Sequence, residues 1–208
     1  MTAKPPEFLY FDLGKVIVDF DVDVMCRQMG VAAGVSPELV SKAIFDTDLQ
    51  TRYESGEIDG RQFYEDFCDA TGCRPDYEAL QRAGSDIFTL NTTIVPLIAQ
   101  LRAAGYRLGV LSNTCHSHWE HCMRRFRILG ELFTVYALSY RIRRAKPDPA
   151  IFHAAAELAG VAPADIFYTD DIAGHIASAK TAGFDAVQYT STPELAAELR
   201  NRGFRFNY

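Results

Sequence analysis

The sequence lacks a long hydrophobic run. None of the apolar stretches in its 208 residues approaches the ~20 residues that a membrane-spanning helix needs. The segment from Met1 to Glu7 is also too short and too polar for a secretory signal peptide. We therefore expect a cytoplasmic protein that binds no membrane.

The sequence also lacks a block of basic residues. It holds 21 lysines and arginines against 27 acidic residues, so its formal net charge is −6. Because a nucleic-acid surface needs clustered positive charge, we expect no nucleic acid partner. An anionic substrate would need a local positive site instead.

Cysteine is scarce, and the number of cysteines is odd. Five cysteines in a chain without a predicted signal peptide indicate reduced thiols rather than a disulfide framework. The apolar content of 48% and the charged content of 23% are those of an ordinary soluble protein. A chain of this length fits one domain with a substantial insertion, or two small domains.

Four consecutive apolar residues, Phe8 to Phe11, predict a strand that is buried on both faces. The run ends on Asp12, and ligands in open α/β sheets bind beyond the carboxyl ends of the strands. Asp12 is therefore a candidate for chemistry, although an aspartate there also suits a turn. Gly14 lets the backbone pass close to a ligand, and Val16 to Val18 suit a second short extended piece.

The region from residue 19 to residue 89 predicts helices. Asp21 or Asp23 suits the start of a helix that reaches Val31, and Ser36 with Pro37 opens another. Asp59 precedes a helical pattern over residues 61–68. This region predicts a small helical bundle inserted after the first strand.

From Asn91 onward, helical and strand patterns alternate. We expect helices over residues 91–105 (with Asn91 as the cap), 117–127, 150–160, 172–183 and 193–201, and strands over residues 106–111, 134–139, 166–169 and 185–189. Together with the first strand, these segments predict an α/β fold with a doubly wound, parallel sheet.

Polar residues follow three of the later strands and loops: Ser112, Lys146, and the pair Asp170 and Asp171. With Asp12, their order resembles the signature of the haloacid dehalogenase (HAD) superfamily. That signature has a nucleophilic aspartate after the first strand, a serine or threonine after the second, a lysine before a helix, and acids after the fourth. The corresponding segments are residues 11–14 (FDLG), 110–114 (VLSNT), 144–149 (RAKPDP) and 167–171 (FYTDD).

The resemblance implies a domain organisation. It implies a Rossmann-like core of residues 1–18 and 90–208 and a helical cap of residues 19–89. The sequence of residues 52–58 (RYESGEI) is similar to the corresponding segment in the branch that includes sugar-phosphate phosphatases and the phosphatase domain of epoxide hydrolases. In that branch the loops of the cap select the substrate, which places specificity around residues 45–58.

The resemblance also implies roles for single residues. Asp12 would be the nucleophile, Ser112, Asn113 and Lys146 would bind the phosphoryl group, and Mg²⁺ would be held by Asp12, the carbonyl of Gly14, Asp170 and Asp171. An ionised carboxylate repels the phosphate dianion that it must attack, so a cation is needed. Mg²⁺ together with Lys146 balances the three carboxylates and leaves a neutral frame for an anion.

Two residues depart from the family pattern. Gly14 stands where most phosphatases of the superfamily have a second aspartate that serves as general acid and base. The absence of that group typically costs about 10²- to 10⁴-fold in rate. His175 stands where the family has aspartate or asparagine, and it either takes part in proton transfer, orients Lys146, or faces solvent.

Residues 115–122 (CHSHWEHC) contain a cluster of cysteine and histidine. The spacing permits a transition-metal site, but one helix rarely presents four ligands tetrahedrally, and the same residues suit the lining of a substrate pocket. Trp119 would pack against the cap or a dimer partner. The alternating aromatic residues of the tail, from Gly203 to Tyr208, suit a last strand or an interface, so the protein is a monomer or a homodimer.

Three functions follow from the sequence. The first is a Mg²⁺-dependent phosphatase for a small phosphorylated metabolite such as a sugar phosphate, which the pair Asp170 and Asp171 favours. The second is a haloacid dehalogenase, which Gly14 fits. The third is a non-catalytic homologue that binds a phosphorylated ligand or a protein, which Gly14 and His175 together leave open.

Overall fold

A five-stranded parallel sheet forms the centre of the protein. The computed structural model describes residues 5–208, so residues 1–4 of the predicted core segment and of the segment Met1 to Glu7 lie outside the described residues. The strand order is β5-β4-β1-β6-β7. The strands are β1 (Phe8–Phe11), β4 (Arg107–Ser112), β5 (Val135–Leu138), β6 (Ile166–Asp170) and β7 (Asp185–Gln188). The prediction of a parallel, doubly wound α/β sheet is confirmed.

Strand β1 lies in the middle of the sheet and is fully buried. Phe8 pairs in register with Arg107 of β4 on one side and with Ile166 of β6 on the other. Leu9 and Phe11 belong to the hydrophobic core on one face of the sheet, and the alternate side chains of β1 belong to the core on the other face. The alternation of side chains along a strand explains why four consecutive apolar residues are needed here.

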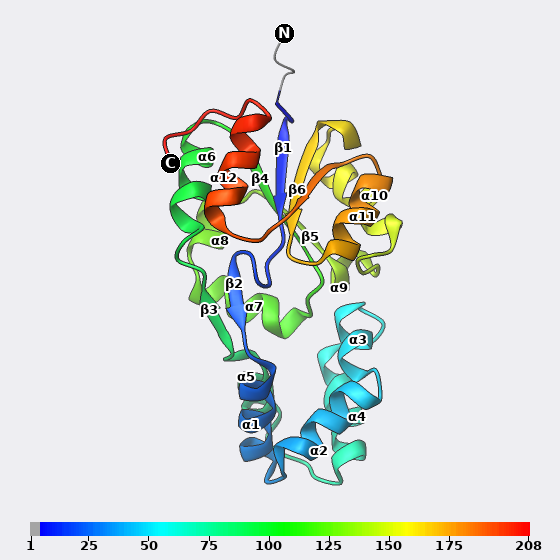
Figure 1. Cartoon of the computed structure of the whole chain (residues 1–208). Coiled ribbons are helices and arrows are strands. Elements are labelled where there is room, and N and C mark those ends of the chain that lie inside the picture. Colours follow the sequence, from blue (N-terminus) through cyan, green and yellow to red (C-terminus); the bar gives the residue numbers. More distant parts are fainter. Residues whose placement is uncertain (1–4) are drawn as a thin grey trace.

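Helices cover both faces of this sheet (Figure 1). One face packs against α6 (Val95–Ala103), α7 (His116–Arg125), α8 (Ile128–Leu132) and α12 (Thr192–Asn201). The other face packs against α10 (Pro149–Ala159) and α11 (Ala173–Thr181). A short 3-10 turn, η2 (Pro163–Asp165), leads into β6. No helix within residues 5–208 is both long enough and apolar enough to cross a membrane.

Residues 22–85 form a helical insertion, which we define as α1 (Val22–Ala33), α2 (Pro37–Ser41), the π-helical turn η1 (Lys42–Asp46), α3 (Leu49–Glu54), α4 (Gly60–Thr71) and α5 (Tyr77–Ser85). Side-chain oxygens of Asp21, Ser36 and Asp59 accept hydrogen bonds from the first backbone N–H groups of α1, α2 and α4. Such caps satisfy donors that a helix leaves unpaired, so the sequence locates the three helix starts correctly.

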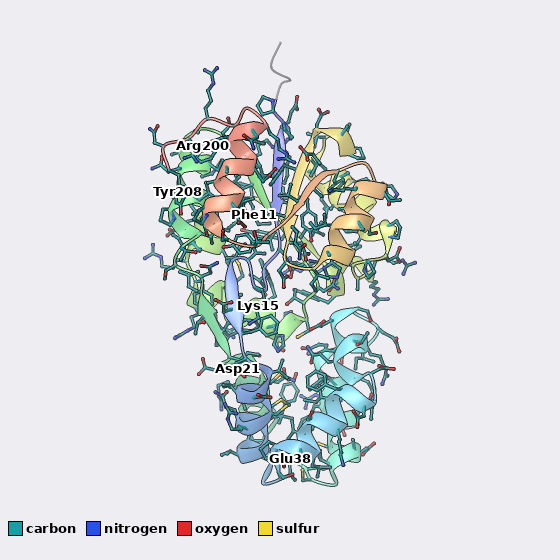
Figure 2. The ribbon with its side chains drawn as sticks, in the orientation of Figure 1. Phe11, Lys15, Asp21, Glu38, Arg200 and Tyr208 are labelled. Atoms are coloured by element: carbon teal, nitrogen blue, oxygen red, sulfur yellow. The ribbon has the colours of Figure 1, made fainter. Side chains whose placement is uncertain are left out.

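A two-stranded antiparallel ribbon joins the sheet domain to the helical insertion (Figure 1). It consists of β2 (Val18–Phe20) and β3 (Phe88–Leu90). In Figure 2, Lys15 lies just before this ribbon, Asp21 just after it, and Glu38 at the far end of the insertion. The predicted boundaries at residues 18/19 and 89/90 fall within the ribbon, and β3 lies in a stretch for which only helices were predicted.

Two local predictions are wrong, and one of the two alternatives for the tail is not found. Asn91 does not cap a helix: its side chain accepts hydrogen bonds from Thr93, and α6 begins only at Val95. Ser139 is not the end of a strand but the start of the short helix α9 (Ser139–Ile142). The tail forms no strand; instead the buried Phe204 packs edge-on against Tyr106, at 5.0 Å between ring centroids.

Candidate active site

Asp12 follows the last residue of β1 at the carboxyl edge of the sheet. Its backbone N–H donates to the carbonyl of Thr169 at 2.9 Å, and its Oδ1 accepts from the backbone N–H of Leu13 at 2.7 Å. The residue is 6% exposed. Backbone contacts therefore fix the carboxylate in a nearly dry position at the edge where this class of sheet binds ligands.

Lys146 lies in the loop before α10, and Asn113 fixes its backbone. The N–H of Lys146 donates to Oδ1 of Asn113 at 2.7 Å, and Nδ2 of Asn113 donates to the carbonyl of Lys146 at 2.9 Å. The ammonium group lies 2.9 Å from Oδ1 of Asp12 and 2.6 Å from Oδ2 of Asp170. The structure therefore brings the predicted residues Asp12, Asn113, Lys146 and Asp170 together.

Asp170, the last residue of β6, has a full set of hydrogen-bond donors. Its Oδ1 accepts from the backbone N–H of Ile172 at 2.8 Å, and Nδ1 of His175 lies 3.0 Å from its Oδ2. Because a carboxylate only accepts, His175 donates here, and it contacts the same carboxylate that binds Lys146. Its side chain is mostly buried, so it does not simply face solvent. The hydroxyl of Tyr168 also donates to Oδ2 and accepts from Lys146 at 3.0 Å.

Tyr168 is a site residue that the sequence analysis missed. It stands two positions before Asp170 on β6, and side chains two apart in a strand point to the same face. The spacing of two residues between Tyr168 and Asp170 was the signal in the sequence that could have identified Tyr168. Burial together with the charges of Asp12 and Asp170 raises the pKa of Tyr168 well above its usual value, so it remains a hydrogen-bond donor.

The carboxylates of Asp12, Asp170 and Asp171 gather at one point. One oxygen from each lies within 4.8 Å of the others, and they form the sole such group of potential metal ligands among residues 5–208. Burial raises the pKa of Asp12 to about 6, although Lys146 opposes the shift. Burial and the charge of Asp170 also raise the pKa of Asp171.

The pKa of Asp170 shifts in the opposite direction from the pKa values of Asp12 and Asp171. Burial raises its pKa, but the hydrogen bond from His175 and the charge of Lys146 outweigh that effect and hold the pKa well below its ordinary value. One lysine therefore faces three carboxylates. The site has an excess of negative charge that a cation with a preference for hard oxygen ligands fits.

Gly14 lies beside the aromatic ring of Phe20. A Cβ atom at this position would lie 2.9 Å from Cε1 of Phe20, which is closer than side-chain atoms pack. A second aspartate here would therefore require the Phe20 ring of the ribbon to shift.

A cavity of about 320 Å³ opens between the carboxyl edge of the sheet and the helical insertion. Ser112, which is 1% exposed, lines it, and the Ser112 hydroxyl donates to the carbonyl of Asn113 at 3.2 Å. Other lining residues from the sheet domain and ribbon are Leu13, Gly14, Phe20, Ile87, Phe88, Asn113, Thr114 and His118; those from the insertion are Val22, Met25, Phe45, Gln50, Thr51 and Glu54.

The cysteine and histidine residues of α7 do not form a metal site among the described residues. Nε2 of His118 lies 3.1 Å from the carbonyl of Gly84 in α5, so His118 joins the insertion to the sheet domain and lines the cavity. Trp119 is buried and packs on Tyr136 of β5, at 5.1 Å between ring centroids. The expectation of a pocket-lining role is correct for His118.

These features define a class of protein: an α/β protein with an aspartate, a lysine and two further acids clustered at the carboxyl edge of a parallel sheet. A family model described as haloacid dehalogenase-like hydrolase matches residues 11–183. The chain belongs to that hydrolase family, and the predicted superfamily is confirmed.

Two curated relatives act on phosphate esters by name. Phosphatase MT3486 of Mycobacterium tuberculosis (strain CDC 1551 / Oshkosh) is 33% identical over 91 residues, which cover 44% of this chain and 42% of the phosphatase. The chain thus spans less than half the length of this relative. Beta-phosphoglucomutase of Bacillus subtilis (strain 168) is 26% identical over 171 residues, with 74% of each protein covered.

Solved structures share the fold. The HAD family enzyme BT-2542 of Bacteroides thetaiotaomicron, in complex with magnesium and inorganic phosphate, has a TM-score of 0.78 at 23% identity, with 89% of this chain and 94% of that chain covered. L-2-haloacid dehalogenase of Xanthobacter autotrophicus has a TM-score of 0.63 at 19% identity, with 94% and 82% covered.

Proposed function

We propose that the protein is a Mg²⁺-dependent phosphatase that hydrolyses a small phosphorylated metabolite through an aspartyl-phosphate at Asp12. The observation that carries this proposal is the contact of Lys146 with both Asp12 and Asp170, at 2.9 and 2.6 Å, beside a third carboxylate. A dehalogenase has no use for a cluster of acids, because they repel its carboxylate substrate unless a metal is bound.

The donor set fits a magnesium ion. The carboxylates of Asp12, Asp170 and Asp171 would hold the ion, with the carbonyl of Gly14 as a further ligand. These are hard oxygen donors of the kind that Mg²⁺ prefers, and their summed charge exceeds that of Lys146. When bound, the ion would supply positive charge that stabilises the phosphoryl oxygens as the bond to the leaving group breaks.

Asp12 performs the first step. With a pKa of about 6, its carboxylate is mostly ionised at neutral pH. One of its oxygens forms a bond to phosphorus while the ester P–O bond breaks, and the departing alkoxide takes a proton from solvent because Gly14 offers none. Ser112 and Asn113, which line the cavity, hold the phosphoryl oxygens, and the positive charge of Lys146, buried beside Asp12, attracts them. Water then attacks the phosphorus of the aspartyl-phosphate, which releases inorganic phosphate and restores Asp12.

The helical insertion would act as a cap over this chemistry. Its residues Val22, Met25, Phe45, Gln50, Thr51 and Glu54 form one side of the cavity, and the carboxyl edge of the sheet forms the other. A substrate in the cavity would therefore contact both parts. This position supports a role of the insertion in substrate selection and in the exclusion of water.

The test is the release of phosphate from p-nitrophenyl phosphate, with Mg²⁺ and with EDTA. We expect activity that EDTA abolishes and that Asp12→Asn reduces by more than ~10³-fold. Asp69→Asn, a change of the same kind on the exposed face of α4, is the matched control. Activity that survives EDTA or Asp12→Asn contradicts the proposal. Chloride release from 2-chloropropionate would instead support the dehalogenase that Gly14 permits.

A further inference from the structure

The charge of the cavity lining is one-sided. Among the lining residues that belong to the described part of the chain, residues 5–208, neither lysine nor arginine occurs, and Glu54 is the sole acid. Burial lowers the pKa of His118, which keeps this side chain neutral at neutral pH. If the phosphoryl group binds beside Asp12, the rest of the substrate lies in this cavity, where it meets one negative side chain and no positive one.

Glu54 is held in place at the end of α3. Its backbone carbonyl accepts a hydrogen bond from the hydroxyl of Ser139 at 2.5 Å, which ties the helix end to the sheet domain. Its carboxylate accepts from Nε2 of Gln50 at 2.7 Å, and no ion pair within residues 5–208 involves Glu54. The charge of Glu54 is thus fixed at the cavity and uncompensated by a neighbouring cation.

The two lysines nearest to Asp12 in sequence or in space do not add positive charge to the cavity lining. Lys15 follows Gly14, but its ammonium group donates to the carbonyl of Phe20 at 2.8 Å and lies 3.9 Å from the carboxylate of Asp19. Lys146 is fully buried between Asp12 and Asp170 and does not line the cavity. Neither lysine lines the cavity, so neither contributes positive charge to its wall.

The remaining wall of the cavity is mostly apolar. Met25, Ile87 and Phe88 line it as buried side chains, at 3%, 8% and 7% exposed. Val22 and Phe45 lie toward solvent at 38% and 39% exposed. Apolar groups do not replace the hydration that an anion loses on entry, so this wall adds to the cost of placing a negative charge here.

We propose that the cavity selects phosphate monoesters whose leaving group carries no negative charge, and that Glu54 determines this selection. The proposal rests on the proposed phosphatase function. Leaving groups that are neutral or carry an amine are accepted, whereas bisphosphates, phosphorylated carboxylic acids and nucleoside diphosphates are rejected. Two like charges about 6 Å apart in a partly buried site repel by enough to change binding on the order of 10- to 100-fold.

The experiment compares three phosphate esters of similar size: phosphoethanolamine, propyl phosphate and 2-phosphoglycolate. We expect kcat/KM for the first two to exceed that for 2-phosphoglycolate by about 10- to 100-fold. Glu54→Gln should narrow this ratio to within about threefold, because the charge is removed while size and the hydrogen bond with Gln50 remain possible. Glu157→Gln, on an exposed face of α10 outside the cavity, is the matched control and should leave the ratio unchanged.

A binding measurement separates this inference from the proposed function. The same three esters are titrated by calorimetry against the Asp12→Asn variant, with and without Glu54→Gln, so that no turnover is required. If phosphoethanolamine and propyl phosphate bind Asp12→Asn more tightly than 2-phosphoglycolate does, and Glu54→Gln removes this difference, the selection by charge is supported even if the protein hydrolyses none of the three esters. Equal affinities, equal kcat/KM values, or a ratio that Glu54→Gln does not change would overturn it.

Discussion

Nζ of Lys146 lies 2.6 Å from Oδ2 of Asp170, and both side chains are completely buried. The same ammonium group lies 2.9 Å from Asp12. Burial lowers the pKa of Lys146, but the charges of Asp12 and Asp170 outweigh that effect and raise it. Lys146 is therefore charged, and it holds two buried carboxylates together.

We predict that Lys146→Met strongly destabilises the metal-free protein. Loss of the ammonium group leaves two buried carboxylates without the cation that lies between them, a change that typically costs about 3–5 kcal/mol. The free energy of unfolding in urea measures this effect. Lys180→Met, at an exposed position of α11, should stay within about 0.5 kcal/mol of the wild type. A loss below about 1 kcal/mol for Lys146→Met would show that the pair is not essential to the fold.

Metal removal should change stability and binding together. We expect Mg²⁺ to raise the melting temperature, because it relieves the repulsion among Asp12, Asp170 and Asp171, and EDTA to reverse the effect. Asp171→Asn should weaken Mg²⁺ affinity by at least about 10-fold, since even partners outside the ligand set contribute that much. Calorimetric titration with Mg²⁺ measures the affinity, with Asp69→Asn as the control. Unchanged affinity in Asp171→Asn would exclude Asp171 as a ligand.

Gly14 and Phe20 should behave as a coupled pair. Gly14→Asp alone should not raise activity, because its Cβ would lie 2.9 Å from the Phe20 ring. With Phe20→Ala in the background, the same substitution gains space for a general acid and should speed hydrolysis of an alkyl phosphate by about 10²-fold. The four proteins of this cycle are compared by kcat/KM. Equal effects of Gly14→Asp in both backgrounds would refute the coupling.

Gly56 and Gly72 offer a matched comparison at the insertion. Both adopt a left-handed backbone, with φ of 70° and 71°, but a Cβ on Gly56 would lie 2.3 Å from the carbonyl oxygen of Tyr140. One on Gly72 would meet no atom of the described residues within 4 Å, apart from its chain neighbours. Gly72→Ala should cost about 1 kcal/mol of backbone strain. Gly56→Ala should cost clearly more and raise KM, because it separates the insertion from the sheet domain. Urea unfolding and kinetics test both, and equal losses would count against the contact.

The cysteines should differ sharply in reactivity. Burial raises the pKa values of Cys115 and Cys122 to about 12, so at pH 8 both remain protonated thiols. Cys26 and Cys68 are also buried, and Cys73 is partly exposed. Since the thiolate is the reactive form, iodoacetamide should label Cys73 in the native protein and all five after denaturation. Mass spectrometry of the labelled peptides reads the result, and rapid native labelling of Cys115 would contradict it.

Much of the fold could be read from the sequence because local patterns determine it. The buried strand at Phe8–Phe11, the caps at Asp21, Ser36 and Asp59, and the order of polar residues after the strands all follow from short segments. Parallel strands place their carboxyl ends along one edge, so Asp12, Lys146 and Asp170 had to come close once the order of the motifs was recognised.

The remaining features depend on contacts between distant segments. Strand β3 has only three residues and gains its partner, β2, from far away in the chain. The ribbon places Phe20 beside Gly14. The position of α7 on the sheet places Trp119 against Tyr136 of β5. Neither spacing nor periodicity specifies such pairings. Tyr168 is the exception, because its position two residues before Asp170 was visible in the sequence.

The central position of β1 also sets an order of assembly for the nascent chain. β1 is the first strand to be synthesised, but its neighbours β4 and β6 follow only after the whole helical insertion, and β6 later still. The helices of the insertion can form local contacts before β4 and β6, the hydrogen-bonding partners of β1, have been synthesised. Asp12 thus emerges early from the ribosome and acquires its surroundings only when β6 is added, so a truncated product that ends before β6 contains Asp12 but lacks Asp170 and Asp171.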